Sequence, residues 1–131
     1  MYQAAQFSGS YTVSQGSFAT QPALAPGDTI TIGQPTSASG TTNQLLEVTV
    51  YDTSGKTKIG PVPFLFQGAS LWCENVLSLD AFYRFFVISL YVDPGGSGYK
   101  ALYGVITQGD PEQVGVWGAE QDGAGTPRKM P

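Results

Sequence analysis

Aromatic and polar side chains in the C-terminal third of the chain suggest a ligand-binding surface. Aromatic rings stack on the apolar faces of sugars, and a few placed polar groups then fix the sugar hydroxyls. Trp117 is the leading candidate, because Val114, Val116 and Gly118 take the opposite face of its strand pattern. The alternative for Trp117 is partly buried packing, which is common for a tryptophan in a strand. The predicted carbohydrate-binding residues are Trp117, Tyr99, Tyr103, Asp110 and Gln113.

The residue types give little support to catalysis. The chain has no histidine and a single cysteine, Cys73, so neither a Ser-His-Asp nor a Cys-His arrangement can form. No phosphate-binding glycine motif is present, since the glycines of residues 95–98 follow a strand pattern and open no helix. Paired carboxylates could hydrolyse glycosides, but turns or solvated strand faces account for the candidates Glu47, Asp52, Glu74 and Asp80. We therefore predict that the protein is not an enzyme.

Metal and cofactor chemistry is also predicted to be absent. With no histidine and one cysteine, the ligands of a structural zinc site are missing. Oxygen ligands suit calcium, and the acids in loops that could meet at one end of the fold are Asp93, Asp110, Glu112, Glu120 and Asp122. Their spacing does not match an EF-hand, and solvated loop acids are the favoured interpretation. We predict no metal and no cofactor.

The most apolar stretch of the chain is residues 81–92, around which the rest must be organised. As a strand it has apolar side chains on both faces, because successive residues point in opposite directions. Its aromatic and β-branched residues favour a strand over a helix. One face must fill the core, and the other needs a cover, which is a loop, another sheet, a second subunit or a ligand. The predicted subunit interface consists of Tyr83, Phe85 and Tyr91.

Short strand patterns separated by turn residues run along the whole chain. Residues 34–43 are expected to form a polar loop, and residues 68–79 fit either a short strand or a helical turn. Proline removes backbone donors, so the strand that contains Pro61 is an edge or has a bulge at Gly60-Pro61. The predicted strands are residues 7–14, 28–33, 44–52, 56–66, 81–92, 99–107 and 113–119, with a hairpin turn at residues 52–55.

This pattern predicts one all-β domain that covers residues 1–131. About eight short strands with turns between them are typical of a sandwich or a barrel. Hairpin neighbours imply antiparallel pairing. We expect an antiparallel β-sandwich of jelly-roll-like topology, with a barrel as the alternative.

Charge and hydropathy limit the partners of the protein. The formal net charge is −4 with only 6 basic residues, so the basic footprint of a nucleic-acid-binding protein is missing. No apolar run reaches the roughly 18 residues of a membrane-spanning helix, so no membrane span is expected. The N-terminal residues lack the basic and apolar segments of a signal peptide. We expect a cytoplasmic or non-classically exported protein, unless a signal peptide has been removed.

Two functional hypotheses remain open. The first is a non-catalytic, lectin-like binding module that uses aromatic, amide and hydroxyl side chains to hold carbohydrate. The second is a structural protein that assembles with itself into a coat, filament, appendage or inclusion through an apolar strand face. A charged fraction of only 12% weakens the repulsion between copies and supports the second hypothesis. The expected partner is a glycan or a second copy, and a homo-oligomer is expected.

Overall fold

The computed structural model of the 131-residue chain describes residues 2–16, 24–37, 40, 43–73, 83–108 and 113–122. Within these ranges a short 3-10 helix, η1 (Ala4–Phe7), precedes nine strands that all belong to one sheet. The strands are β1 (Gly9–Gln15), β2 (Thr29–Ile32), β3 (Thr36–Ser37), β4 (Gln44–Tyr51), β5 (Thr57–Gln67), β6 (Ser70–Cys73), β7 (Tyr83–Val92), β8 (Lys100–Gln108) and β9 (Gln113–Gln121). Every pair of neighbouring strands is antiparallel.

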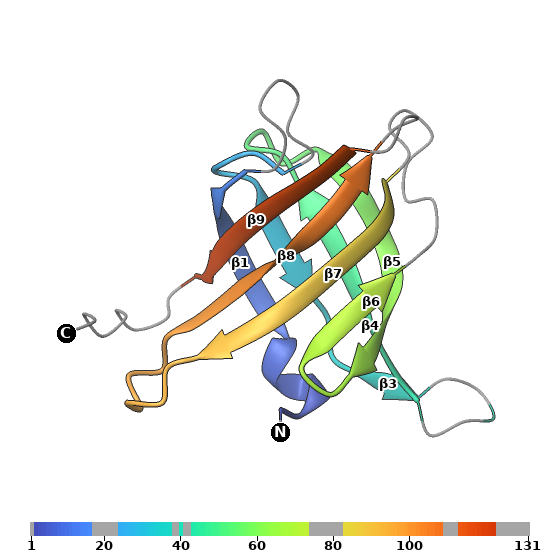
Figure 1. Cartoon of the computed structure of the whole chain (residues 1–131), viewed down its shortest axis with the longest axis vertical. Coiled ribbons are helices and arrows are strands. Elements are labelled where there is room, and N and C mark those ends of the chain that lie inside the picture. Colours follow the sequence, from blue (N-terminus) through green and yellow to red (C-terminus); the bar gives the residue numbers. More distant parts are fainter. Residues whose placement is uncertain are drawn as a thin grey trace.

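Strand β2 closes the sheet into a barrel. The strand order is β2-β1-β9-β8-β7-β6-β5-β4-β3, and β2 also pairs with β4. Ile30, in the middle of β2, lies opposite Tyr11 of β1 on one side and Val50 of β4 on the other. Eight strands therefore form a closed circuit, and the two-residue β3 pairs with the N-terminal end of β4 (Figure 1).

The all-β, antiparallel prediction is confirmed, and the structure has the barrel in place of the favoured jelly-roll-like sandwich. Both architectures put alternate residues inside, so strand periodicity does not separate them. The separating feature is long-range pairing. Strand β1 pairs with the last strand, with Tyr11 opposite Gln121, and this contact joins the two ends of the chain into one continuous sheet.

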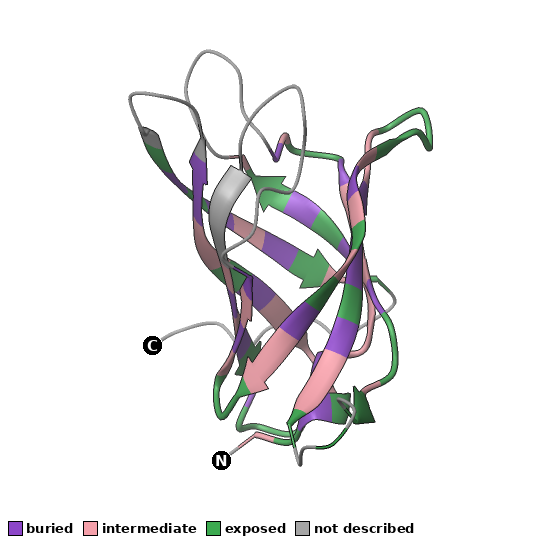
Figure 2. Cartoon of the chain, turned by 90° about the vertical axis from the view of Figure 1, so that its right-hand side faces the viewer, coloured by how far each residue is buried: buried purple, intermediate pink, exposed green. Residues whose placement is uncertain are grey.

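Side chains fill the interior of the barrel. Buried and exposed residues alternate along the strands, as Figure 2 shows. On β7, β8 and β9, Ile88, Gly104 and Trp117 lie opposite one another in an inward-facing row. A Cβ atom at Gly104 would lie 3.1 Å from Cζ2 of Trp117 and would collide with the backbone oxygen of Val87. The glycine thus makes room for the indole, as small and large residues do across a narrow barrel.

The β4–β5 hairpin carries the predicted bulge. The register places two residues of β5, Gly60 and Pro61, opposite one residue of β4, Thr49. Gly60 has a φ of 88°, and a Cβ atom there would collide with the backbone oxygen of Val48. The bulge predicted at Gly60-Pro61 is therefore confirmed, and it needs glycine for both reasons.

Two of the segments with weaker sequence patterns also form strands. Strand β6 covers Ser70–Cys73 of the stretch that fitted either a strand or a helical turn, while residues 74–80 lie outside the described ranges. Strand β3 lies within residues 34–43, where a polar loop was expected. Both residues of β3 are exposed, so no apolar alternation marks it in the sequence.

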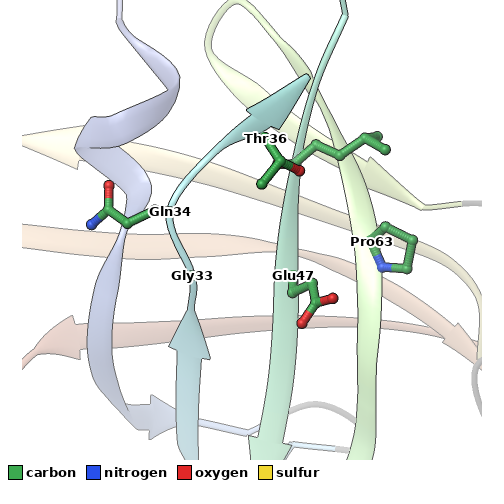
Figure 3. Close-up of a pocket in the computed structure, with 6 residues that line it drawn as sticks. Gly33, Gln34, Thr36, Glu47 and Pro63 are labelled. Carbon is green, nitrogen blue, oxygen red and sulfur yellow. The ribbon is translucent and has the colours of Figure 1, made fainter. Parts of the chain in front are cut away.

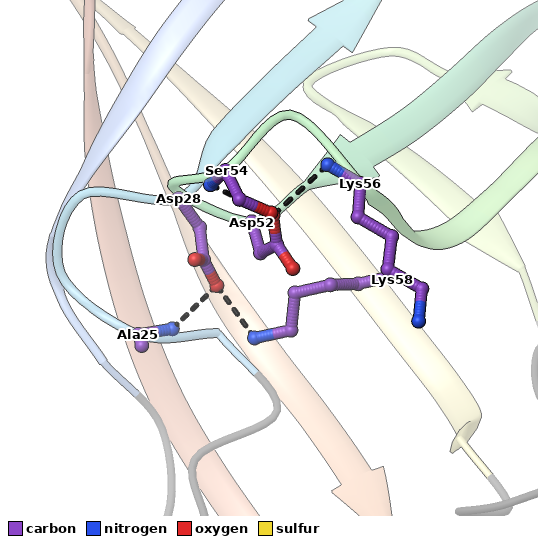
Figure 4. Close-up of polar contacts among 6 residues, drawn as sticks. All are labelled: Ala25, Asp28, Asp52, Ser54, Lys56 and Lys58. Atoms are coloured by element: carbon purple, nitrogen blue, oxygen red, sulfur yellow. Dashed lines mark hydrogen bonds and ion pairs between the residues drawn. The ribbon is translucent and has the colours of Figure 1, made fainter.

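A buried ion pair fastens the β1–β2 connection to β5. The carboxylate of Asp28 accepts hydrogen bonds from the backbone N–H of Ala25 at 2.9 Å and from Nζ of Lys58 at 2.7 Å (Figure 4). The Asp28 side chain is only 3% exposed, and that of Lys58 is 25% exposed. The pair therefore compensates a carboxylate that would be costly to bury alone.

The hairpin turn predicted at residues 52–55 is held by its own carboxylate. Oδ1 of Asp52 accepts hydrogen bonds from Oγ of Ser54 at 2.6 Å, and from the backbone N–H groups of Ser54 and Lys56, each at 2.9 Å. The hydroxyl of Ser54, followed by the backbone of Lys56, lowers the pKa of Asp52. This turn accounts for Asp52, one of the four carboxylates considered for catalysis.

Candidate functional site

Trp117, the leading candidate from the sequence, packs in the core. Its side chain is 2% exposed, whereas Val114 and Val116 on the same strand are 65% and 69% exposed. The buried position of Trp117 agrees with the alternative interpretation, which was packing. Trp117 faces inward and Val114 and Val116 face outward, the reverse of the orientation that a binding surface at Trp117 requires. Both faces contain large apolar residues, so alternation alone left their direction open. Glu120, which shares its face with Val114 and Val116, is the signal that could have assigned that face to solvent.

The outer face of β7, β8 and β9 holds the exposed candidates. Tyr91, Tyr103, Val114 and Val116 are the large hydrophobic side chains that are exposed in the part of the chain that the structure describes. Tyr103, which is 53% exposed, lies between Ser89 of β7 and Gly118 of β9. These two small neighbours offer the tyrosine ring almost nothing to pack against, so the ring stays accessible.

Three tyrosines gather at the β7–β8 hairpin end of this face, and we call Tyr91, Tyr99 and Tyr103 the tyrosine cluster. The rings of Tyr91 and Tyr99 meet edge to face, with centroids 6.1 Å apart and an interplanar angle of 62°. Tyr91 lies opposite Ala101, two residues from Tyr103 along β8, and such diagonal neighbours are within reach of aromatic side chains.

A carboxylate adjoins the tyrosine cluster. The hydroxyl of Tyr99 donates a hydrogen bond to Oε1 of Glu120, at 3.3 Å. Burial, followed by the charge of Glu120 and this hydrogen bond, raises the pKa of Tyr99, so the phenol stays protonated as a donor. Glu120 itself is exposed and keeps acceptor capacity for a ligand hydroxyl.

The hairpin loop that leads to Tyr99 is ordered by Asp93. Its carboxylate accepts hydrogen bonds from the backbone N–H of Gly95 at 3.0 Å and from Oγ of Ser97 at 2.6 Å. The backbone N–H of Asp93 also donates to the carbonyl oxygen of Tyr99, at 3.0 Å. The hydrogen bonds of Asp93 therefore stabilise the hairpin loop, and the loop in turn positions Tyr99.

The other predicted site residues are placed only in part. Asp110 lies outside the described residues. Gln113 begins β9 opposite Gln108, but its side chain lies outside them as well. The same holds for the side chains of Tyr83 and Phe85, two of the three predicted interface residues, although their backbone belongs to β7. Tyr91, the third, is 40% exposed on the outer face.

A pocket of about 360 Å³ lies on the opposite side of the barrel, where β3 meets β4 and β5 (Figure 3). Among the described residues that line it, Glu47 is the one that carries a carboxylate. The residues that line the pocket are Gly33, Gln34, Thr36, Leu45, Glu47 and Pro63.

Of the five acids considered as calcium ligands, Asp93, Glu120 and Asp122 lie within the described residues, and each accepts hydrogen bonds from other residues of the chain. Glu120 accepts from Tyr99, and Asp122 accepts hydrogen bonds from the hydroxyls of Ser10 and Thr12. Within the described residues no three acidic or thiol side chains come together as metal ligands would. None of the helical turns in the same residues has the length and apolar character to cross a membrane.

Fold and site together define an eight-stranded antiparallel barrel with a filled interior and a tyrosine cluster on its outer wall. No protein-family model matches the chain, and no curated protein or solved structure matches it either. The function must therefore be argued from the site itself.

Proposed function

We propose that the protein is a non-catalytic, lectin-like binding module that holds carbohydrate on its tyrosine cluster. One observation carries the proposal. Among the aromatic side chains that the structure describes, only Tyr91 and Tyr103 are exposed, at 40% and 53%, and they are diagonal neighbours on one face. Two accessible rings side by side suit the apolar faces of sugar rings.

The polar groups around the two rings suit the hydroxyls of a sugar. Glu120 supplies a carboxylate acceptor, Tyr99 a phenol and Ser89 a hydroxyl, all within one or two strand positions of Tyr91 or Tyr103. Hydroxyl groups of this kind can donate as well as accept, and the carboxylate accepts only. A neutral polyol therefore suits the site better than an anionic ligand, which Glu120 would repel.

The test is a glycan array probed with the full-length protein, followed by titration calorimetry of the strongest oligosaccharide. Tyr103→Ala should weaken binding about fivefold, since the loss of one stacking ring costs on the order of 1 kcal/mol. Tyr103→Phe should retain most of the affinity, because it keeps the ring and removes only the hydroxyl.

Tyr51→Ala is the matched control, because Tyr51 is a half-buried tyrosine on the outer face of β4, away from the cluster. It should leave binding unchanged. The proposal fails if the wild-type protein binds no glycan at millimolar concentration, or if Tyr103→Ala binds as tightly as the wild type while remaining folded by circular dichroism.

A further inference from the structure

A second apolar surface lies beyond the tyrosine cluster on the same outer face. Val105 of β8 lies opposite Val87 of β7 and Val116 of β9, and Val114 follows toward the other end of β9. We call Val105, Val114 and Val116 the valine patch. Val114 and Val116 are 65% and 69% exposed, more than the tyrosines beside them. β-branched side chains suit strands, but exposure of this degree on adjacent positions marks a contact surface.

The row of the valine patch continues around the barrel. Val87, which lies opposite Val105 on one side, lies opposite Trp72 of β6 on the other, and Trp72 in turn lies opposite Leu65 of β5. Trp72 and Leu65 are half-buried. Apolar side chains thus occupy one outward row across five adjacent strands. Contact of so wide an apolar row with water is unfavourable.

Charge on this face selects the partner. The outward positions of β7, β8 and β9 whose side chains are described carry a single charged group, Glu120, at the end occupied by the tyrosine cluster. Glu120 lies at the far end of this face, so two copies can meet at the valine patch without opposing their Glu120 carboxylates, although each copy has a net charge of −4. A strongly charged partner, such as a nucleic acid, would find no complementary charge here.

The closed barrel determines how a second copy can approach. Strands β1, β2 and β4–β9 each have neighbours on both sides, so the described circuit presents no long free edge for strand addition. Association must therefore pack side chains of one outer face on those of another. The commonest arrangement for two identical chains is a twofold axis, at which a residue meets its own copy.

We propose that two copies of the chain pair face to face through their valine patches, about a twofold axis that passes near Val116. The pairing buries Val114 and Val116 of each copy against the other. Tyr103, the diagonal neighbour of Val116, lies at the edge of this contact, whereas Tyr91 and Tyr99 lie farther along the face. The pairing itself does not depend on glycan binding.

The test is sedimentation equilibrium of the full chain, and of the Val116→Glu and Val116→Lys variants, over a concentration series. The wild type should form a dimer, and each variant should dimerise at least tenfold more weakly because two like charges meet at the axis. An equimolar mixture of the two variants should recover the dimer as a heterodimer. Thr57→Glu, which adds the same charge at an exposed position at the start of β5, should dimerise like the wild type.

Three outcomes would overturn the proposal. The first is a wild-type protein that stays monomeric at about 100 µM, where weak specific interfaces are already occupied. The second is a dimer that both charged variants retain. The third is a mixture that stays monomeric, which would exclude a twofold contact at Val116. If a charged variant unfolds, Val116→Thr keeps the side-chain shape and should still weaken the dimer, while glycan binding by the monomer remains a separate readout.

Discussion

The outer wall of the barrel has two halves of different chemistry. The outer positions of β7–β9 bear the valine patch and the tyrosine cluster. Those of β1, β2 and β4 bear hydroxyl groups, and we call this set the hydroxyl face: Ser10, Thr12, Thr29, Thr31 and Thr49. The backbone is paired in the same antiparallel way in both halves, so the difference lies in the side chains alone.

Three residues of the hydroxyl face, Ser10, Thr12 and Thr31, donate their hydroxyl groups to acceptors within the chain. The carboxylate of Asp122 accepts hydrogen bonds from Ser10 at 3.2 Å and from Thr12 at 2.5 Å, and the hydroxyl of Thr31 donates to the carbonyl oxygen of Thr49 at 3.5 Å. The valine patch offers water nothing comparable. Hydroxyl groups of one half thus find partners within the chain, whereas a second copy on the valine patch would remove exposed apolar surface from water.

If this contrast holds, changes near the hydroxyl face should alter stability and leave association intact. The largest such effect is expected for Asp28→Ala. This substitution removes the carboxylate that pairs with Lys58 and accepts a hydrogen bond from the backbone N–H of Ala25. Because Lys58 is partly solvated, we expect a loss of about 2 kcal/mol in the free energy of unfolding, below the full cost of breaking a buried pair.

Urea denaturation measures this loss. Asp28→Asn is the control, because it keeps an acceptor for the backbone of Ala25 and removes only the charge, and it should cost less than Asp28→Ala. A loss below 0.5 kcal/mol, within the usual range of surface substitutions, would show that the ion pair does not fasten this half.

A smaller effect is expected inside the barrel on the same side. Tyr11 is fully buried, and its hydroxyl donates to the carbonyl oxygen of Phe7 at 2.8 Å. Tyr11→Phe should cost about 1 kcal/mol, the usual net value of one hydrogen bond plus the acceptor left unpaired. The measurement is again the free energy of unfolding in urea.

Tyr11 also predicts a pH dependence. Burial raises its pKa to about 12 from the ordinary value of 10.0, because the phenolate is disfavoured in the interior. The stability that the neutral phenol contributes is therefore complete below pH 10 and is lost as the pH rises toward 12. The stability difference between wild type and Tyr11→Phe should shrink over this range, and a constant difference would contradict the assignment.

The smallest effect on stability is expected on the valine patch. Val114→Thr gives β9 the chemistry of the hydroxyl face at a position that is 65% exposed. The free energy of unfolding of the monomer should change by no more than about 0.5 kcal/mol, while dimerisation should weaken measurably in sedimentation equilibrium. A large loss of monomer stability together with unchanged dimerisation would reverse the contrast between the two halves.

Much of the strand content could be predicted from local patterns. The alternation of Leu46, Val48 and Val50 predicted β4, and Gly60-Pro61 predicted the bulge opposite it. Strand β3 could not be predicted, because Thr36 and Ser37 are both exposed and leave no apolar pattern. Of the candidate site, Tyr91, Tyr99 and Tyr103 could be identified by residue type, but not their proximity to Glu120.

The sequence by itself determined the all-β class, the antiparallel hairpins and the lack of nucleophilic-triad residues, because these follow from residue types and from contacts close along the chain. Only the tertiary structure decided that the sheet closes, and with it which face of β9 is inside. Trp117 points inward because Gly104, thirteen residues earlier, leaves space for its ring, and Val116 consequently points outward. A strand with apolar residues on both faces has no preferred direction until its neighbours in the barrel provide the room on one side.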